Sequence, residues 1–407
     1  MTTDQRVVVV GASMAGLRAT EQLRAAGHTG PITVIGAEDH LPYNRPPLSK
    51  DVLAGADPIT ALELAAKLAF RRRASTADVE FVLGDAVTSA DLAGRTVTTA
   101  SGSTFPWDGL VVATGLRPRR LSLPGPTAGR HVLRTVDDCF GLRSELAAPR
   151  RVVVVGAGFI GCEAAATLTR LRHHVTVVEP AGRPMERVLG ADLAAAIQRH
   201  HEALGIEFRL GTGIVGYSGE DRVDGVLLGT GEELPADVVI EAAGSVANTE
   251  WLAGNGLDLT DGVLVDNHLA VVGAECVVAV GDIARFPNPL FDDLPRRVEH
   301  WSIPTDTAKR AAATLTAHLR GDEPADLPFA PIPSFWSDQF DLRLQSYGSP
   351  ALADESCVEE GDLDGLRAGA LIAYRRDGHL VGNVAVNLPP ARQRELREQF
   401  STLVPTA

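Results

Sequence analysis

Two segments of the chain repeat one pattern of apolar and polar positions. Residues 6–27 and 151–172 each begin with a strongly apolar run that contains four consecutive valines, pass through a glycine-rich turn and continue into a stretch rich in alanine and leucine. An unbroken apolar run predicts a strand buried on both faces, and the stretch after the turn predicts an amphipathic helix. A second apolar run follows each helix, as ITVIGAE or VTVVEP. The pattern therefore predicts two strand–helix–strand units, which are typical of an α/β fold.

The C-terminal part of the chain has a different pattern. FDLRLQSYG alternates between apolar and polar residues, and GALIAYRRDGHLVGNVAV contains an Asp-Gly pair between two such runs. Alternation around an Asp-Gly turn predicts a small antiparallel sheet. The charged segment PPARQRELREQF predicts a closing helix, and the acidic, proline-containing segment RGDEPADLP at 320–328 indicates a domain boundary.

The turns of the two units contain small residues at regular spacing. They are Gly11, Ser13 and Gly16 in the first unit, and Gly156, Gly158 and Gly161 in the second. In a G-x-G-x-x-G turn the first glycine allows the tight turn, the second admits a pyrophosphate, and the third lets helix and strand pack closely. Serine at the middle position of the first turn adds little bulk, and its hydroxyl can donate to a phosphate. Two such turns, each between a strand and a helix, predict two dinucleotide sites.

An acidic residue follows the second strand of each unit, where a ribose would lie. These residues are Glu38 and Glu179. A carboxylate at this position accepts from a ribose 2′-hydroxyl and repels a 2′-phosphate, so Glu179 favours NADH over NADPH. Arg183 and Arg187 lie nearby in the sequence and could weaken this preference.

Composition excludes several other classes of protein. The 407 residues contain 38 Lys and Arg against 52 Asp and Glu, a net charge of −14, which argues against general nucleic-acid binding. No run approaches the roughly 18 apolar residues that a membrane span requires. The N-terminus lacks the pattern of a secretory signal. The four cysteines lie far apart in the sequence, so we expect reduced thiols in a cytoplasmic protein and no metal site.

Several further segments have a recognisable form. They are LPYNRPPLSK, LVVATGLRPRRL, VLRTVDD, AVGDIARF and SFWSDQFDLRLQSYG. With the two glycine turns they resemble the two-dinucleotide flavoproteins of the glutathione-reductase type. Within that group the chain is most similar to NADH-dependent, FAD-containing ferredoxin reductases of the putidaredoxin reductase and biphenyl dioxygenase reductase type. The resemblance extends from about residue 6 to about residue 348.

The resemblance implies an α/β fold with two Rossmann-like dinucleotide-binding domains and a C-terminal α+β interface domain. The FAD domain is expected at 1–118 and 243–324, the NAD domain at 119–242, and the interface domain at 325–407. The implied activity is hydride transfer from NADH to FAD, followed by single-electron transfer to an acidic iron–sulfur ferredoxin that supplies a bacterial oxygenase.

The resemblance also assigns the two residues expected closest to the chemistry. Lys50, at the end of RPPLSK, would lie beside the flavin and pair with Glu163 on the helix of the NAD unit. A fixed ammonium stabilises the negative charge that develops on the ring when hydride arrives. Lysine supplies a compact point charge, and Pro46 and Pro47 restrict the backbone that directs it.

The resemblance implies further contacts with the two nucleotides. Those to FAD are Ala15, Arg45, Val87, Ala113, Thr114, Gly115, Arg134, Asp282 and Trp301, and Ile160 would contact NAD. Arg134 could instead be a surface ion-pair residue, Asp282 a helix cap and Trp301 a core aromatic. An alanine, Ala37, occupies the position of the usual FAD ribose acid, so either Glu38 substitutes or that contact is lost. Ile303, Pro304 and Thr307 also depart from the usual pattern.

The ferredoxin would dock near Lys309, Arg310 and Trp336, although Trp336 could equally be a core aromatic. Two other functions stay open: an NADH-binding redox-signalling flavoprotein of the apoptosis-inducing-factor type, and an NADH oxidase. An oxidase or peroxidase of this fold would require a cysteine near position 43, but the first cysteine is Cys139. A disulfide reductase would require a redox cysteine pair, and the sequence contains none.

Overall fold

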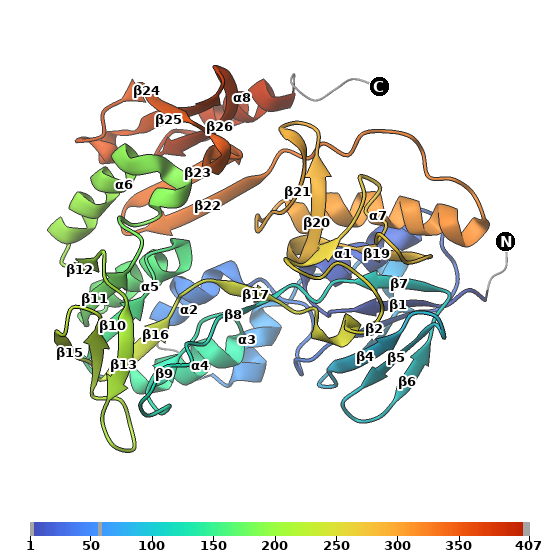
Figure 1. Ribbon diagram of the computed structural model, residues 1–407, viewed down its shortest axis with the longest axis horizontal. Coiled ribbons are helices and arrows are strands. Elements are labelled where there is room, and N and C mark those ends of the chain that lie inside the picture. Colours follow the sequence, from blue (N-terminus) through green and yellow to red (C-terminus); the bar gives the residue numbers. More distant parts are fainter. Residues whose placement is uncertain (1–3, 56–58, 402–407) are drawn as a thin grey trace.

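The computed structural model describes residues 4–55 and 59–401, so the outermost residues of the predicted first and last domains lie outside the described residues. The first predicted unit lies in a parallel sheet of order β19-β7-β1-β2-β3, on the right of Figure 1. Its strands are β1 (Val7–Val10), β2 (Ile32–Ile35), β3 (Glu80–Val82), β7 (Gly109–Val112) and β19 (Val277–Ala279). Helices α1 (Met14–Ala25) and α7 (Ile303–Arg320) pack against each other beside this sheet. The four valines of β1 are buried, as the apolar run predicts.

Two small antiparallel sheets accompany the first parallel sheet. One contains β4 (Val87–Asp91), β5 (Thr96–Thr99) and β6 (Thr104–Pro106). The other contains β20 (Ala284–Asn288) and β21 (Asp292–Arg297), and the short strand β18 (Val263–Leu264) pairs parallel to β20. The segment between β2 and β3 contains the turn η1 (Pro46–Ser49) and helices α2 (Asp51–Ala54) and α3 (Ala61–Leu68). Thr60 and Glu63 form a capping box at the start of α3.

The second predicted unit lies in a separate parallel sheet of order β12-β11-β10-β16-β9. Its strands are β9 (Arg130–His131), β10 (Arg151–Val155), β11 (His174–Glu179), β12 (Glu207–Leu210) and β16 (Val238–Glu241). Helices α4 (Val136–Glu145), α5 (Phe159–Arg170) and α6 (Glu186–Ala203) accompany it, together with a sheet of β13 (Ile214–Ser218), β14 (Gly225–Leu228) and β15 (Glu233–Pro235). The chain passes from one parallel sheet to the other at β8 (Leu116–Pro118) and returns at β17 (Ser245–Ala247). These two strands pair antiparallel with each other.

The C-terminal part is an antiparallel sheet of order β22-β23-β26-β25-β24, of which β24, β25 and β26 lie above α6 in Figure 1. Its elements are β22 (Ser334–Gln339), β23 (Leu342–Gly348), β24 (Glu355–Gly361), β25 (Ala370–Arg376), β26 (His379–Val386) and helix α8 (Pro390–Ser401). The predicted Asp-Gly turn is present, with φ of 52° at Asp377 and 75° at Gly378. The predicted antiparallel sheet and closing helix are thus confirmed. Buried side chains of α5 and β23 share one apolar cluster, which joins this sheet to the second unit.

Candidate functional site

The first glycine turn joins β1 to α1 in very tight packing. Gly11 has φ of +121°, and a Cβ there would overlap the carbonyl oxygen of Ala113. A Cβ at Gly16 would overlap the carbonyl oxygen of Gly11 itself. Ser13 is the N-cap of α1, and its side chain makes no capping hydrogen bond, so none of its bonding capacity is used on the helix end. The turn therefore brings α1 against the sheet and presents its N-terminal N–H groups at the strand ends.

The second glycine turn repeats this geometry between β10 and α5. Gly156 has φ of +108°, and its Cβ would overlap the carbonyl oxygen of Ala242, while that of Gly161 would overlap the oxygen of Gly156. A Cβ at Gly158 would meet no atom within 4 Å, so the middle position faces open space. Ile160 beside it is 46% exposed. An open middle position above an uncapped helix terminus fits a dinucleotide pyrophosphate at this second turn.

The acid that follows the first unit is held by side chains. Arg45 Nη2 donates to Glu38 Oε1 over 2.5 Å, and the Tyr43 hydroxyl donates to Glu38 Oε2 over 2.6 Å. Arg45 also donates from Nε to Ser13 Oγ, at 3.4 Å, and from Nη1 to the carbonyl of Arg134, at 3.0 Å. Burial raises the pKa of Glu38, but the charge and hydrogen bond of Arg45, together with the hydrogen bond of Tyr43 and the charge of His40, hold this pKa below its ordinary value. Arg45 thus links the first turn to Glu38.

The acid that follows the second unit is held by the backbone instead. Glu179 Oε2 accepts from the N–H of Ala157, inside the glycine turn, and Oε1 accepts from the N–H of Ala181, each over 2.8 Å. The carboxylate is therefore fixed beside the turn, where a ribose bound there would meet it. The side chains of Arg183 and Arg187 are exposed nearby.

Lys50 and Glu163 meet, although 113 residues separate them in the chain. Lys50 Nζ donates to Glu163 Oε2 over 2.6 Å. Ser49 Oγ donates to the same oxygen over 2.6 Å, and Ser337 Oγ donates to Oε1 over 2.7 Å. Glu163 is buried on α5, Ser337 is fully buried on β22, and only 16% of the Lys50 side chain is exposed. The Glu163 carboxylate of the second unit thus accepts from two groups of the first part of the chain and from one group of the C-terminal part.

The residues after β7 and β19 lie at the ends of the first parallel sheet. Thr114 Oγ1 donates to the carbonyl of Asn248 over 2.8 Å, and Asn248 Nδ2 donates back to the carbonyl of Thr114 over 2.9 Å. Gly115 accepts from the N–H of Asn248. Arg134 Nη2 lies 3.5 Å from Asp282 Oδ2, and burial raises the pKa of Asp282 despite this cation. Val87 begins β4 and is half-buried.

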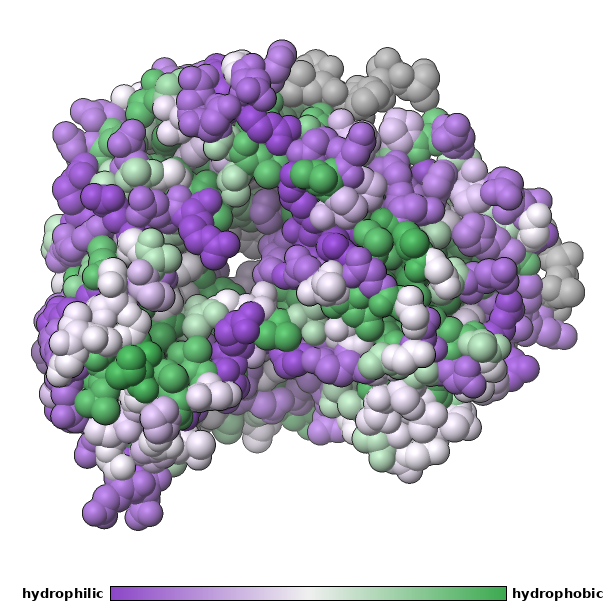
Figure 2. Space-filling view, viewed as in Figure 1, coloured by the Kyte–Doolittle hydropathy of each residue, from purple (hydrophilic) through white to green (hydrophobic). Residues whose placement is uncertain are grey.

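Aromatic side chains gather near β22. The ring centroids of Trp301 and Trp336 lie 5.2 Å apart at 76°, and Trp301 is 36% exposed. Phe335 contacts Phe159, the first residue of α5, with centroids 4.7 Å apart, and also the ring of His300 at 4.9 Å. Burial lowers the pKa of His300 to about 4, so this imidazole is neutral at pH 7. Figure 2 shows that the face turned to the viewer is hollowed at its centre, near the place where Figure 1 draws β22 and β17.

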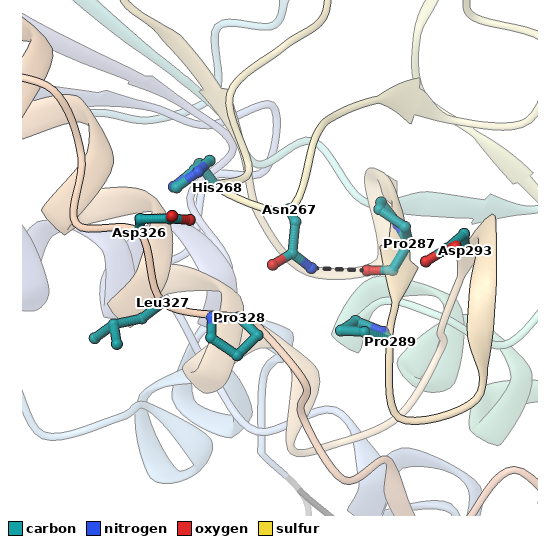
Figure 3. Close-up of a pocket in the computed structure, with 8 residues that line it drawn as sticks. All are labelled: Asn267, His268, Pro287, Pro289, Asp293, Asp326, Leu327 and Pro328. Carbon is teal, nitrogen blue, oxygen red and sulfur yellow. Dashed lines mark hydrogen bonds between the residues drawn. The ribbon is translucent and has the colours of Figure 1, made fainter. Parts of the chain in front are cut away.

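The two basic residues expected at a docking surface have different surroundings. Lys309 is exposed on α7, whereas Arg310 donates from Nη2 to the Leu327 carbonyl over 2.7 Å and lies 2.7 Å from His268 Nδ1. Arg310 therefore attaches the 320–328 segment to the first unit. A pocket of about 310 Å³ adjoins this attachment, and Figure 3 shows Asn267 bridging to Pro287 at its wall. Its eight lining residues include none of the candidate site residues.

Sequence reasoning did not assign several residues that complete the site. Ser49, Ser337 and Tyr43 all lie within segments that carry the resemblance, and Asn248 follows β17. The sequence signal that could have identified them is a polar side chain within an otherwise apolar or proline-rich motif. Within residues 4–55 and 59–401, no helix has the length and apolarity needed to span a bilayer, and no group of three or more His, Cys, Asp or Glu could hold a metal. All four cysteines are free thiols.

Comparison with known proteins gives consistent matches over almost the whole chain. Residues 5–308 match the family model described as pyridine nucleotide-disulphide oxidoreductase, and residues 334–400 match that of the reductase C-terminal domain. A probable ferredoxin reductase from Castellaniella defragrans is 36% identical over 394 residues, covering 96% of this chain and 92% of that protein. Putidaredoxin reductase from Pseudomonas putida is 34% identical over 357 residues, covering 86% and 81%. The crystal structure of a covalent putidaredoxin reductase–putidaredoxin complex superposes with a TM-score of 0.86 at 31% identity, covering 98% of this chain and 93% of that chain.

Proposed function

The chain belongs to the pyridine nucleotide-disulphide oxidoreductase family, and from that premise we propose that Lys50 and Glu163 form the centre of an NADH-dependent ferredoxin reductase. The enzyme is a flavoprotein that binds FAD and NAD(H), and its electron acceptor is an iron–sulfur ferredoxin that supplies an oxygenase. When bound, FAD supplies the conversion of a two-electron hydride into single electrons. The protein has to hold the two nucleotides, fix a charge between them and present an edge to the ferredoxin.

The single observation that carries the proposed site is the Lys50–Glu163 contact. It joins the loop after the first unit to the helix that follows the second glycine turn. This supports the proposal that the pair lies between the two bound nucleotides. Ser49 and Ser337 occupy both oxygens of Glu163, so the carboxylate cannot rotate freely and Lys50 is held with it. An ammonium fixed in a largely buried position needs little reorganisation when negative charge develops beside it.

The two turns hold different nucleotides in this proposal. Gly11, Ser13, Ala15 and Gly16 would receive the FAD pyrophosphate, with Arg45 and Glu38 beside it. Gly156, Gly158, Ile160 and Gly161 would receive NAD, and Glu179 would accept from its ribose. Support comes from the overlap that any side chain would produce at Gly11 and Gly156, and from the open space at Gly158. The remaining FAD contacts are proposed at Val87, Ala113, Thr114, Gly115, Arg134, Asp282 and Trp301.

The ferredoxin would dock at the edge that carries Trp301 and Trp336. Both rings are at least partly exposed there, and Lys309 is exposed on the neighbouring helix α7. Because the chain as a whole carries a charge of −14, an acidic partner needs a local basic group such as this one. Arg310 is proposed to contribute less, since its guanidinium already bonds within the chain.

The same proposal divides the chain into an FAD domain (1–118 and 243–324), an NAD domain (119–242) and an interface domain (325–407). The pairing of β8 with β17 supports it, because both crossings between the parallel sheets lie at these boundaries. We also propose that the enzyme works in the cytoplasm, where free thiols such as its four cysteines persist.

The proposed function is tested by rapid-mixing kinetics on the flavin-loaded protein. We expect NADH to reduce the flavin faster than NADPH does, and a ferredoxin of the acidic type to reoxidise it rapidly. If NADH reduces the flavin rapidly but no ferredoxin accelerates the reoxidation of the flavin, the signalling flavoprotein would be favoured. Fast reoxidation by oxygen alone would favour the NADH oxidase. A colourless protein that takes up no added flavin would refute all three.

A further inference from the structure

The first turn of α7 contains a buried hydroxyl that bonds in two directions. Thr307 is fully buried, and its Oγ1 donates to the carbonyl of Ile303 over 2.5 Å. The same oxygen accepts from the backbone N–H of Gly281 over 2.9 Å. Gly281 lies just after β19, in the turn that precedes β20. One side chain therefore ties the start of α7 to the end of the first parallel sheet.

The turn at Gly281 is enclosed on the sides that face the first glycine turn. Gly281 is buried with φ of +73°, and a Cβ there would lie 2.8 Å from the Cβ of Ala15 and 3.9 Å from Cγ of Pro304. Its buried N–H has Thr307 Oγ1 as its acceptor, and a buried N–H that loses its acceptor is costly. Asp282 follows directly, and its carboxylate contacts Arg134. The position of the Gly281 backbone thus determines the position of the Asp282 backbone, from which the carboxylate extends.

We propose that Thr307 is a positioning residue for the flavin nucleotide: its hydroxyl fixes the Gly281–Asp282 turn, and through it the Asp282 carboxylate that faces the bound FAD. This inference rests on the proposed function, because it takes the first glycine turn as the FAD site. Thr307 makes no direct contact with the cofactor in this scheme. Its effect passes through one backbone hydrogen bond, which a shape-preserving substitution removes.

Three single variants separate the hydroxyl from the shape and from general stability. Thr307→Val keeps the volume and branching and leaves the Gly281 N–H without an acceptor. Thr307→Ser keeps the hydroxyl and loses a methyl group. Thr314→Val is the matched control on the same helix, since Thr314 is 1% exposed and donates to the carbonyl of His268 over 2.6 Å, a hydrogen bond that does not involve Gly281 or Asp282.

The measurements are the dissociation constant of FAD, obtained by fluorescence titration of flavin-stripped protein, the visible circular dichroism of the holoprotein, and its thermal unfolding. We expect Thr307→Val to weaken FAD binding by roughly tenfold and to change the flavin dichroism. Thr307→Ser is expected within about threefold of the wild type, since it retains both hydrogen bonds. Thr314→Val is expected to lower the unfolding temperature but to leave the FAD dissociation constant unchanged.

A double variant tests whether the effect passes through Asp282. In an Asp282→Asn background, Thr307→Val should cause little further loss of FAD affinity, since coupled residues are not additive. Full additivity would overturn the inference, as would a Thr307→Val protein with wild-type affinity, a Thr307→Ser protein as weak as Thr307→Val, or an equal loss in Thr314→Val. A wild-type protein that takes up no flavin would instead overturn the proposed function, so the two failures are distinguishable.

Discussion

The two glycine turns are alike in their backbone and differ in their side chains. In both, the first and third glycines lie against backbone carbonyls that exclude any Cβ. The middle position is Ser13 in the first turn, in contact with Arg45, and Gly158 in the second, facing open space. The following acid is neutralised by a guanidinium in the first unit and held by two backbone N–H groups in the second.

A dinucleotide turn of this kind requires its two outer glycines, and each site adds its own side chains. The strand-to-helix geometry depends on the two outer glycines and is the same twice over. In the proposed assignment, the first turn holds a nucleotide that stays bound and the second holds one that enters and leaves. A turn bonded to Arg45 through Ser13 suits the first task, and an open turn with a fixed carboxylate suits the second.

The largest effects are expected from the outer glycines. Gly11→Ala and Gly156→Ala each add a Cβ that overlaps a backbone carbonyl at a positive φ. We expect Gly11→Ala to lose nearly all bound flavin, measured from the visible spectrum. Gly156→Ala should keep its flavin but lose roughly 10²-fold in kcat/KM for NADH, since misplacement by about 1 Å costs that much. If Gly156→Ala lost flavin as completely as Gly11→Ala, the two turns would not serve separate nucleotides.

The contact between the two units comes next. Glu163→Gln removes the charge that holds Lys50 while keeping the side chain's size. We expect flavin reduction by NADH to slow by roughly 10²-fold, the cost of losing one fixed charge-stabilising group. Rapid-mixing absorbance measures it, and Lys67→Gln, at another of the three lysines, is the control. Unchanged reduction in Glu163→Gln would remove the Lys50–Glu163 pair from the mechanism.

The middle position of the second turn should behave differently from its neighbours. A Cβ at Gly158 meets no atom of the protein within 4 Å, so Gly158→Ala should leave the unfolding temperature nearly unchanged. The methyl group would still occupy the space of the coenzyme, and we expect KM for NADH to rise by roughly tenfold. A large loss of stability in this variant would show that the open space is filled within the protein.

The acid of the second unit should govern the choice of coenzyme. Glu179→Gln removes the negative charge that would repel a 2′-phosphate and leaves one acceptor for two backbone N–H groups. We expect the ratio of kcat/KM for NADH over NADPH to fall by roughly tenfold. Steady-state assays with both coenzymes measure it. Glu38→Gln, the equivalent change in the first unit, should leave this ratio unaltered.

The smallest effect concerns the acid of the first unit and pH. The pKa of Glu38 lies below its ordinary value of 4.5, so its ionisation stabilises the folded state above that pH. This contribution is lost as pH falls through the folded-state pKa. We therefore expect the wild type to lose more stability than Glu38→Gln between about pH 5 and pH 3, by about 1 kcal/mol or less. Denaturant unfolding at several pH values measures it, and parallel pH curves would contradict it.

Much of the fold is readable from local pattern. The valine runs predict β1 and β10, the alternation predicts the C-terminal sheet, and the Asp-Gly pair predicts the turn between β25 and β26. The structure confirms all of these. The family and both cofactors also followed from the sequence, through the glycine turns and the segments around them. The residue-level roles in the site, and the domain boundaries, stay predictions.

The sequence by itself determined the strands and helices of the two repeated units, the C-terminal sheet and the two tight turns, because apolar periodicity and the absence of a Cβ act within a few residues. Only the tertiary structure decided the partners. Ser337 donates to Glu163 across 174 residues, Arg45 donates to Glu38, and Arg310 donates to the carbonyl of Leu327. The physical reason is that a buried polar group bonds to whichever partner the packed elements bring within hydrogen-bond distance. Local sequence does not specify which distant segments pack together, so it does not specify the partner.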